Sequence, residues 1–493
     1  MIPNDRSLVF LLALASACSE SPSSAPSDAG RDAPGDIVKR DVATDAPAPL
    51  PTIEGLEEVP DENPDPRVVE VRLRAGAAEA QLAPGALTQV LAFNGRTPGP
   101  LIHARVGDRV IIHFRNDLDE ETTIHWHGLR IPDAQDGSPR IQNPVPPGGE
   151  FAYSFVVPDP GTFWYHSHVN VVRQIERGLY GALVVHENPA PAFNVERVFV
   201  LDDVKLGTNN QIAQFLTSGP DIGRGRLGNR LLCNGAATPC EVTARRGAVE
   251  RWRVVNAANA RSFDFTVRGA SWRIIATDGG ILPEAFVTTG VNIAPGQRYD
   301  IEVRHDDPAA ATAELVADIP VLLADGGVGT REFPLISAAH EGEVTPIEPV
   351  YPTVTLPSID APDAGARSWL LSGGVTDAGV EFTINGQSGA GHNHGLTDTF
   401  RQGEPVRIQI VSRVSPEHPF HLHGQFFQIV ERGRSPVTDE PGLRDTVLVR
   451  GNEPVTILTY FENPGQWMFH CHISEHSELG MMGELTVVPR MQR

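Results

Sequence analysis

The sequence predicts an all-β protein made of three consecutive domains, and three observations support this fold class. The 493 residues include 47 glycines and 42 prolines, a composition that places many turns between short segments. Apolar residues alternate with polar ones, as at Val69, Val71 and Leu73, with the period of two that a β-strand imposes. A third observation is a pattern of a glycine followed by a strand, which recurs along the chain. We therefore expect short strands packed as sandwiches or barrels.

The recurring pattern sets the size of the domains. Its ten-residue copies are GDRVIIHFRN at 107–116, GAVERWRVVN at 247–256 and GEPVRIQIVS at 403–412. The copies lie 140 and then 156 residues apart, a spacing of one ordinary domain. The expected domain ranges are 66–190, 191–348 and 349–493.

A targeting segment is expected before these domains, at residues 1–17. Arg6 precedes an apolar run at 8–14, and small residues follow it up to Cys18. The run is too short to cross a bilayer as a helix. Small residues before a cysteine are similar to a bacterial lipoprotein processing site, which predicts a lipid anchor on Cys18. The alternative is ordinary signal cleavage beside an incidental cysteine. Either route predicts export to the periplasm or the outer surface of a bacterium.

Residues 18–65 are expected to form a disordered acidic linker. They are rich in Ser, Pro and Ala, and from residue 19 onward their 3 basic residues face 12 acidic ones. The whole chain carries a formal charge of −22, which argues against nucleic acid and anionic membrane surfaces as partners.

Two of the remaining cysteines, Cys233 and Cys240, flank a turn-rich loop. An oxidising compartment predicts a local disulfide between them. Two free thiols or a metal pair are the alternatives, and no histidine stands nearby to support a metal pair.

Four His-x-His pairs occur in matching register within domains one and three. Each pair presents two imidazoles on one face of a strand, because side chains at i and i+2 point the same way. The pairs are 125/127, 166/168, 421/423 and 470/472. If the two terminal domains pack together, eight neutral nitrogen ligands converge, enough for three copper ions with positions open to oxygen. Domain two has no such pair.

A single cysteine lies between the last pair of histidines. Cys471 must point to the opposite face from His470 and His472, so one strand can serve two metal sites. His476 and Met481 follow, and His418 precedes, which together give the two-His, one-thiolate, one-thioether set of a blue-copper centre. In domain one, Ser167 stands at the position equivalent to Cys471, so only domain three can form this centre.

These motifs identify a family resemblance. Over residues 66–490 the chain resembles three-domain multicopper oxidases of the laccase kind, through HWHG at 125–128, WYHSH at 164–168, HPFHLHG at 418–424 and HCHISEHSELGMM at 470–482. The resemblance implies three cupredoxin-like Greek-key β-barrels and four copper ions. Type 1 copper would take His418, Cys471, His476 and axial Met481, and type 2 copper would take His125 and His421. The type 3 coppers would take His127, His166 and His472, and His168, His423 and His470.

The resemblance also implies a reaction. A small reducing substrate would give single electrons to the type 1 site, and O2 would be reduced to water at the other three coppers. Asp136 matches an acidic position that family members place near the type 2 copper, and we assign proton delivery to it; an Asp-Gly turn on the surface is the alternative. Some members of the family carry a second acid directly after the residue equivalent to His476. In this sequence that position is Ser477, and Glu478 follows it.

The donor is less well defined by the sequence. Axial Met481 favours phenols and aromatic amines over donors that need a high potential. The alternatives are a metallo-oxidase acting on ferrous, manganous or cuprous ions, a non-catalytic copper-binding scaffold of the same fold, and a copper-buffering protein. The five methionines form no Met-rich insert of the kind that cuprous oxidases carry.

Overall fold

The computed structural model describes residues 49–491, apart from 216–218, 323–326, 361–364, 378, 392 and 415–416. Strands dominate this part of the chain, so the predicted all-β class is confirmed. The helices are short, and they are α1 (Val171–Glu176), α2 (Gly219–Arg224), α3 (Ser474–Glu478) and the 3-10 helix η1 (Asp133–Gln135). Among the described residues, none of them has the length and apolar character needed to cross a membrane. The signal segment and the Cys18 anchor site lie outside the described residues.

Domain one consists of two four-stranded sheets. The first runs in the order β3 (Thr88–Phe93), β2 (Val68–Ala80), β5 (Arg109–Asn116), β7 (Glu150–Val156). The second runs in the order β4 (Gly99–Arg105), β9 (Tyr180–His186), β8 (Gly161–His166), β6 (His125–His127). Alternate residues of β2 and β5 face a shared core that includes Val71, Leu73 and Ile112.

Domain two also has two sheets. The larger contains β12 (Ala236–Ala237), β11 (Arg230–Cys233), β10 (Val195–Val204), β14 (Val249–Asn256), β19 (Arg298–Arg304), β16 (Ser271–Thr277) and β17 (Gly280–Phe286), with β1 (Ile53–Glu54) beside β10. The smaller contains β13 (Cys240–Arg246), β21 (Val328–Glu343), β20 (Thr312–Leu322), β15 (Phe263–Arg268) and β18 (Val291–Ile293). The predicted Cys233–Cys240 disulfide is present, and it joins β11 of one sheet to β13 of the other.

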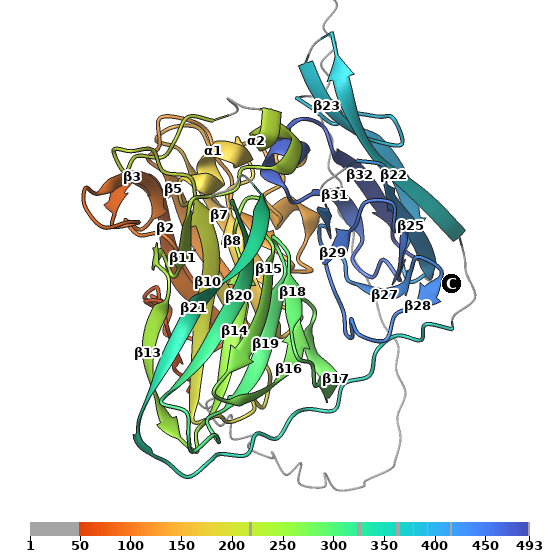
Figure 1. Cartoon of the computed structure of the whole chain (residues 1–493). Coiled ribbons are helices and arrows are strands. Elements are labelled where there is room, and N and C mark those ends of the chain that lie inside the picture. Colours follow the sequence, from red (N-terminus) through yellow and green to blue (C-terminus); the bar gives the residue numbers. More distant parts are fainter. Residues whose placement is uncertain are drawn as a thin grey trace, which may run out of the picture. The chain divides into compact units, whose positions relative to one another are not determined.

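Domain three repeats the arrangement. One sheet contains β23 (Gly379–Ile384), β22 (Gly365–Thr376), β25 (Val406–Ser412), β30 (Val455–Thr459), β27 (Phe427–Arg432) and β28 (Ser435–Pro436). The other contains β24 (Leu396–Arg401), β32 (Met482–Val488), β31 (Gly465–Cys471), β26 (His418–Leu422) and β29 (Thr446–Val449). Figure 1 separates the strands of domain three, in blue, from the orange to green strands of domains one and two.

The three copies of the ten-residue pattern form equivalent strands. β5, β14 and β25 each pair in parallel with the first long strand of their domain, which is β2, β10 and β22 in turn. Each also pairs antiparallel with a later strand of the same domain, which is β7, β19 and β30. The glycines that precede them, Gly107, Gly247 and Gly403, all have positive φ, as a tight turn before a strand requires. The repeat prediction is confirmed at the level of strand pairing.

The expected disordered linker at 18–65 is wrong for its last part. Residues 53–54 form β1 and pair in parallel with β10, and the Val59 amide donates to the Leu101 carbonyl at 2.9 Å. Ile53 and Val59 are buried, 8% and 4% exposed. The prediction used the average composition of the segment, which is polar. It therefore missed these two apolar residues, each of which packs in a hydrophobic core. Residues 18–48 of that linker lie outside the described residues.

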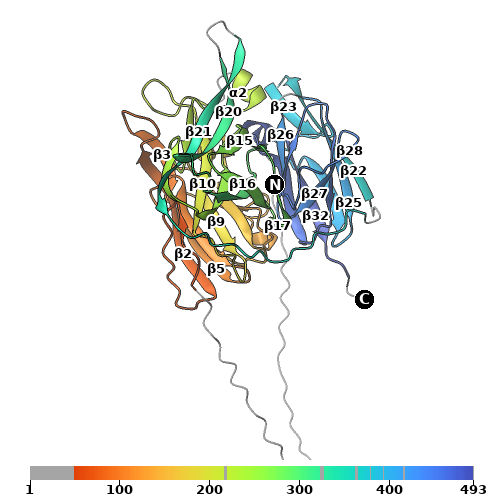
Figure 2. The same ribbon diagram turned by 60° about the horizontal axis from the view of Figure 1, so that its bottom comes forward.

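The domains meet through mixed apolar clusters. Trp164 and Tyr180 of domain one pack with Val198 and Val255 of domain two. Figure 2 views the same strands after a 60° turn and again shows the blue strands of domain three grouped together beside β16 and β17 of domain two. Strand β8, which ends at His166, contributes Trp164 to this cluster.

Candidate metal centre

Strand β31 sends its last side chains to two different places, as its alternation requires. The Cys471 side chain points into the core of domain three and is fully buried. His470 instead faces His168 of domain one, with their Nε2 atoms 3.4 Å apart. His472 faces Trp164 and His166, also of domain one. One strand therefore contributes to two polar clusters.

Two histidine nitrogens lie beside the Cys471 thiol. Its Sγ lies 3.6 Å from His418 Nδ1 and 3.7 Å from His476 Nδ1, and the two nitrogens are 3.1 Å apart. Donors of a trigonal site with bonds of about 2.0–2.3 Å are separated by such distances. The short helix α3 turns the chain back after β31 and so brings His476 beside Cys471. Met481 is buried in the same core, and its carbonyl accepts from the Cys471 amide at 3.0 Å.

The electrostatics of this cluster suit a soft metal ion. Burial raises the pKa of the Cys471 thiol well above its ordinary value, so a cation must supply the stabilisation that lets the thiolate form. Burial lowers the pKa of His418 to about 4 and that of His476 to about 3, which keeps both imidazoles neutral. We call His418, Cys471 and His476 the thiolate set.

Helix α2 of domain two covers the thiolate set. The carbonyls of Ile222 and Gly223 face the His476 ring and partly offset the effect of burial on its pKa. Both histidine side chains are 0% exposed. A donor molecule in solution therefore has no direct contact with either ring.

The eight histidines of the four His-x-His pairs converge at the junction of domains one and three, and we call them the imidazole set. The register is the same in both domains, since His125 pairs with His166 and His421 pairs with His470. The rings of His125 and His423 stack at 3.9 Å between centroids, and those of His127 and His421 at 3.7 Å. All eight are at least nine-tenths buried.

Donor atoms of the imidazole set form groups in which all lie within 4.8 Å of one another. The groups that contain only histidines are His125, His127 and His421; His127, His166 and His472; and His168, His423 and His470. Two of these are the triplets that the resemblance implied for type 3 copper, and the first contains the pair implied for type 2. No residue of domain two belongs to any such group within the described part of the chain.

Backbone carbonyls orient four of these eight rings. The Nδ1 atoms of His125, His166, His421 and His470 lie 2.8–2.9 Å from carbonyl oxygens and donate to them. This leaves Nε2 as the lone-pair nitrogen directed into the cluster. Nε2 of His125, His166 and His421 is buried without any hydrogen-bond partner. Unpartnered buried acceptors are costly unless a metal ion uses them, so these residues fit copper.

His127 uses the opposite nitrogen. Its Nε2 lies 3.2 Å from Asp445 Oδ1 and donates to it, and its Nδ1 is the atom without a partner. The Asp445 carboxylate thus determines which nitrogen of His127 can bind metal. No pattern in the sequence connects these two residues, which lie 318 positions apart.

Asp136 lies where the resemblance placed it. Its Oδ2 accepts from His423 Nδ1 at 2.8 Å, and its Oδ1 is 3.3 Å from His125 Nδ1 without a hydrogen bond. The side chain is fully buried, so the surface-turn alternative is wrong. Gly137 has φ +79°, and a Cβ there would lie 1.8 Å from the Ile124 carbonyl, which explains the Asp-Gly pair.

A cavity of about 360 Å³ reaches the imidazole set at His168. Glu478, Arg140, Met468 and Met482 also line it. Glu478 was the acid next to Ser477 in the sequence, and it lies at this cavity rather than in the thiolate set.

Comparisons with known proteins agree with this geometry. Family models described as multicopper oxidase match residues 75–190, 205–312 and 368–491. A protein named multicopper oxidase MmcO, from Mycobacterium tuberculosis, is 29% identical and aligns over 86% of this chain and 88% of its own length. The crystal structure of Lac15, from a marine microbial metagenome, is 32% identical, with a TM-score of 0.66, and the match covers 85% of this chain and all of that one. A multicopper oxidase from Campylobacter jejuni, described as a metallo-oxidase, is 26% identical with a TM-score of 0.76, over 90% of this chain and 96% of that one.

The fold and the two histidine-rich clusters define a copper-binding protein of three cupredoxin-like domains. The chain belongs to the multicopper oxidase family, whose members use O2 and a reducing substrate.

Proposed function

We propose that this chain is a four-copper oxidase that couples one-electron oxidation of phenolic or aromatic-amine donors to the four-electron reduction of O2. For a phenol the balance is four phenols and one O2 giving four phenoxyl radicals and two waters. The observation that carries the proposal is the position of Cys471 in β31, between His470 and His472. A single strand links the thiolate set to the imidazole set.

Copper, when bound, supplies the one-electron redox chemistry that the side chains lack. The thiolate set with Met481 would hold type 1 copper, and His125 with His421 would hold type 2. The two triplets of the imidazole set would hold the type 3 pair. The path for an electron between the sets is covalent, through the Cys471 side chain and the backbone to its neighbouring histidines.

Protons and oxygen need their own routes to the imidazole set. Asp136 has one oxygen free of hydrogen bonds and within 3.3 Å of His125, so it is the residue that we assign to proton delivery. The cavity at His168 is the entry that we assign to O2, because it is the described cavity that reaches a histidine of the set.

The burial of both type 1 histidines favours a second class of donor. Because α2 separates the His476 ring from solvent, an aromatic donor cannot stack on the imidazole. A metal ion such as Fe(II), Mn(II) or Cu(I) needs no stacking contact, and the similar protein from Campylobacter jejuni is described as a metallo-oxidase. The metallo-oxidase is therefore our second candidate.

A panel of donors with the copper-loaded protein tests both candidates. The proposal expects about four coppers per chain, a blue colour from the thiolate, and O2 uptake with phenols or aromatic amines. O2 uptake with Fe(II), Mn(II) or Cu(I) alone would favour the second candidate. A copper-replete, colourless protein without O2 uptake on any donor would instead support a scaffold or a copper-buffering protein.

A further inference from the structure

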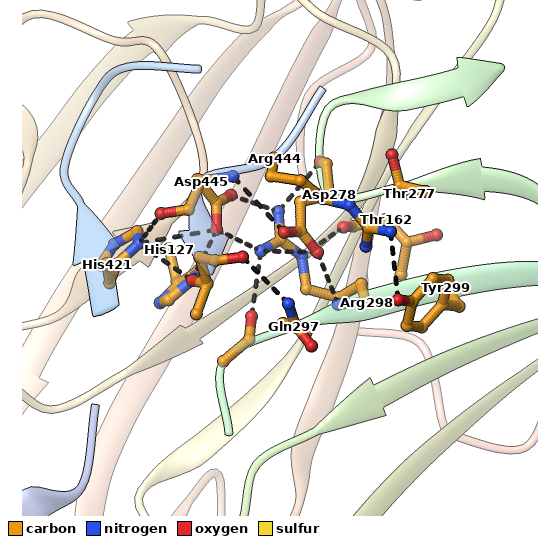
Figure 3. Close-up of polar contacts among 12 residues, drawn as sticks. His127, Thr162, Thr277, Asp278, Gln297, Arg298, Tyr299, His421, Arg444 and Asp445 are labelled. Carbon is orange, nitrogen blue, oxygen red and sulfur yellow. Dashed lines mark hydrogen bonds and ion pairs between the residues drawn. The ribbon is translucent and has the colours of Figure 1, made fainter. Parts of the chain in front are cut away.

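Arg298, in domain two, uses every hydrogen-bond donor of its guanidinium. Nε donates to the Thr162 carbonyl at 2.9 Å, and Nη1 and Nη2 donate to the carbonyls of Gly296 and Asp278, both at 3.0 Å. The two remaining N–H groups donate to the Asp445 carboxylate, at 2.8 Å from Nη1 and 2.7 Å from Nη2. Figure 3 shows this arrangement, which joins all three domains through one side chain.

Asp445 links Arg298 to the imidazole set. Its Oδ1 accepts from His127 Nε2 at 3.2 Å, and the carbonyl of the same residue accepts from His421 Nδ1 at 2.9 Å. His127 and His421 come from different domains and stack on each other. The Asp445 carboxylate thus accepts from Arg298 and from His127 at the same time.

Two glycines leave room for these contacts. A Cβ on Gly128, the glycine of the HWHG motif, would lie 2.4 Å from Arg298 Nη2 and 2.6 Å from Asp445 Oδ2. A Cβ on Gly296 would lie 2.9 Å from His472 Cδ2 and 3.1 Å from His127 Cε1. Both have positive φ, +91° and +87°. The backbone is shaped so that the arginine and its turn can approach the histidines closely.

We propose that Arg298 is a positioning residue through which domain two, itself without copper ligands, holds His127 and His421 in their metal-binding arrangement. The inference rests on the proposed four-copper function. The forked guanidinium holds the Asp445 carboxylate in position. Because this carboxylate accepts from His127 Nε2, His127 Nδ1 remains as the ligand atom. A lysine at 298 would keep the charge but could not bridge the same five acceptors.

The test compares copper retention at the two sets in full-length protein. Arg298→Lys is the variant, and Arg197→Lys is the matched control. Arg197 is also a buried arginine of domain two, and it donates to the fully buried Glu250 at 2.9 Å without contacting a copper-binding histidine. Each protein is loaded with copper and titrated with a chelator. Copper per chain, blue absorption and the electron paramagnetic resonance signal of type 2 copper are then measured.

We expect wild type and Arg197→Lys to behave alike. Arg298→Lys should keep its blue absorption but lose the copper of the imidazole set, and its type 2 signal, at about 10–100-fold lower chelator concentration. Copper retention equal to wild type at every chelator concentration would overturn the inference, and so would equal loss in Arg197→Lys. Wild-type protein holding no copper beyond the blue site would count against the proposed function instead.

A second variant covers the case in which Arg298→Lys does not fold. The double variant Arg298→Gln with Asp445→Asn removes one buried charge of each sign, so the net buried charge stays the same. Loss of type 2 copper with the blue site intact supports the inference, and full retention overturns it. If neither variant folds while Arg197→Lys does, Arg298 acts on the fold alone and the inference is wrong.

Discussion

Cys471 and Ser167 occupy equivalent positions in two copies of one strand. Each is flanked by two histidines, and in each copy the preceding histidine donates to the carbonyl of this central residue, at 2.9 Å from His470 and 2.8 Å from His166. The hydrogen bond that orients the imidazole is thus made to the backbone of the central residue and does not depend on its side chain. The thiol adds a second function to a strand that already serves the imidazole set.

Replacing Cys471 with serine should therefore separate the two sets. We expect Cys471→Ser to lose the blue absorption and its O2 uptake with any donor, because no thiolate remains to bind type 1 copper. The copper bound by the imidazole set should remain, since the carbonyl that orients His470 belongs to the backbone and is kept in the variant. Copper analysis with visible absorption checks this, and a variant that retained both colour and turnover would contradict it.

Gly128 allows a second prediction at the scale of one residue. Gly128→Ala places a methyl group against the Arg298–Asp445 ion pair in a left-handed backbone conformation. Gly95→Ala is the control, because Gly95 also has positive φ, +76°, but a Cβ there meets nothing within 4 Å. We expect Gly128→Ala to lower the free energy of unfolding by about 1–3 kcal/mol more than Gly95→Ala does. Denaturant titration of the copper-free proteins measures the difference, and equal values would show that the cost is backbone strain alone.

Among the elements, those with a strong periodic pattern were predictable. The ten-residue copies form β5, β14 and β25, and the His-x-His pairs lie in short strands or continue directly past their ends, because the period of two determines on which face each side chain lies. Helix α2 was not predictable, since six residues with glycines at 219 and 223 carry no helical pattern. Its position over His476 depends on the packing of domain two against domain three.

The choice of ligand nitrogen also lay beyond the sequence. It depends on which acceptor each ring meets, and for His127 that acceptor is a carboxylate from another domain. Arg298 gave no signal either, because charged residues alternate with Tyr, Ile and Val along the strand RYDIEVR, and only the contacts of the folded chain distinguish Arg298 from Arg304. Residues that position others across domains leave no local pattern.

The Cys233–Cys240 disulfide permits a prediction at the scale of elements. It joins the two sheets of domain two across a separation of seven residues. For so short a loop, its removal should cost about 2 kcal/mol of stability in that domain. Hydrogen exchange of β14 should become faster in the Cys233→Ser, Cys240→Ser double variant, while β5, the equivalent strand of domain one, serves as the internal control. Equal protection of β14 in both proteins would contradict the prediction.

For the molecule as a whole, the N-terminal prediction concerns where the protein resides. We propose that Cys18 becomes a lipidated N-terminus and anchors the exported protein. Cys18→Ser should then move the protein from the membrane fraction to the soluble fraction, and Ser19→Ala should leave it in place. Intact mass of the membrane-bound form should include the lipid, whereas a soluble wild-type protein lacking Cys18 would refute the anchor.

The separation of the ligands along the chain has a consequence for how the protein is made. His168 meets His470 across 302 positions, and Asp136 meets His423 across 287. Contacts of such high sequence separation form late, because a long loop must close before they stabilise anything. During synthesis, neither cluster is complete until β31 and the residues after it, up to Met481, have left the ribosome near the end of translation. A chain that stops before β31 therefore lacks part of both clusters, so full copper loading is a readout that the entire chain has been made and has folded.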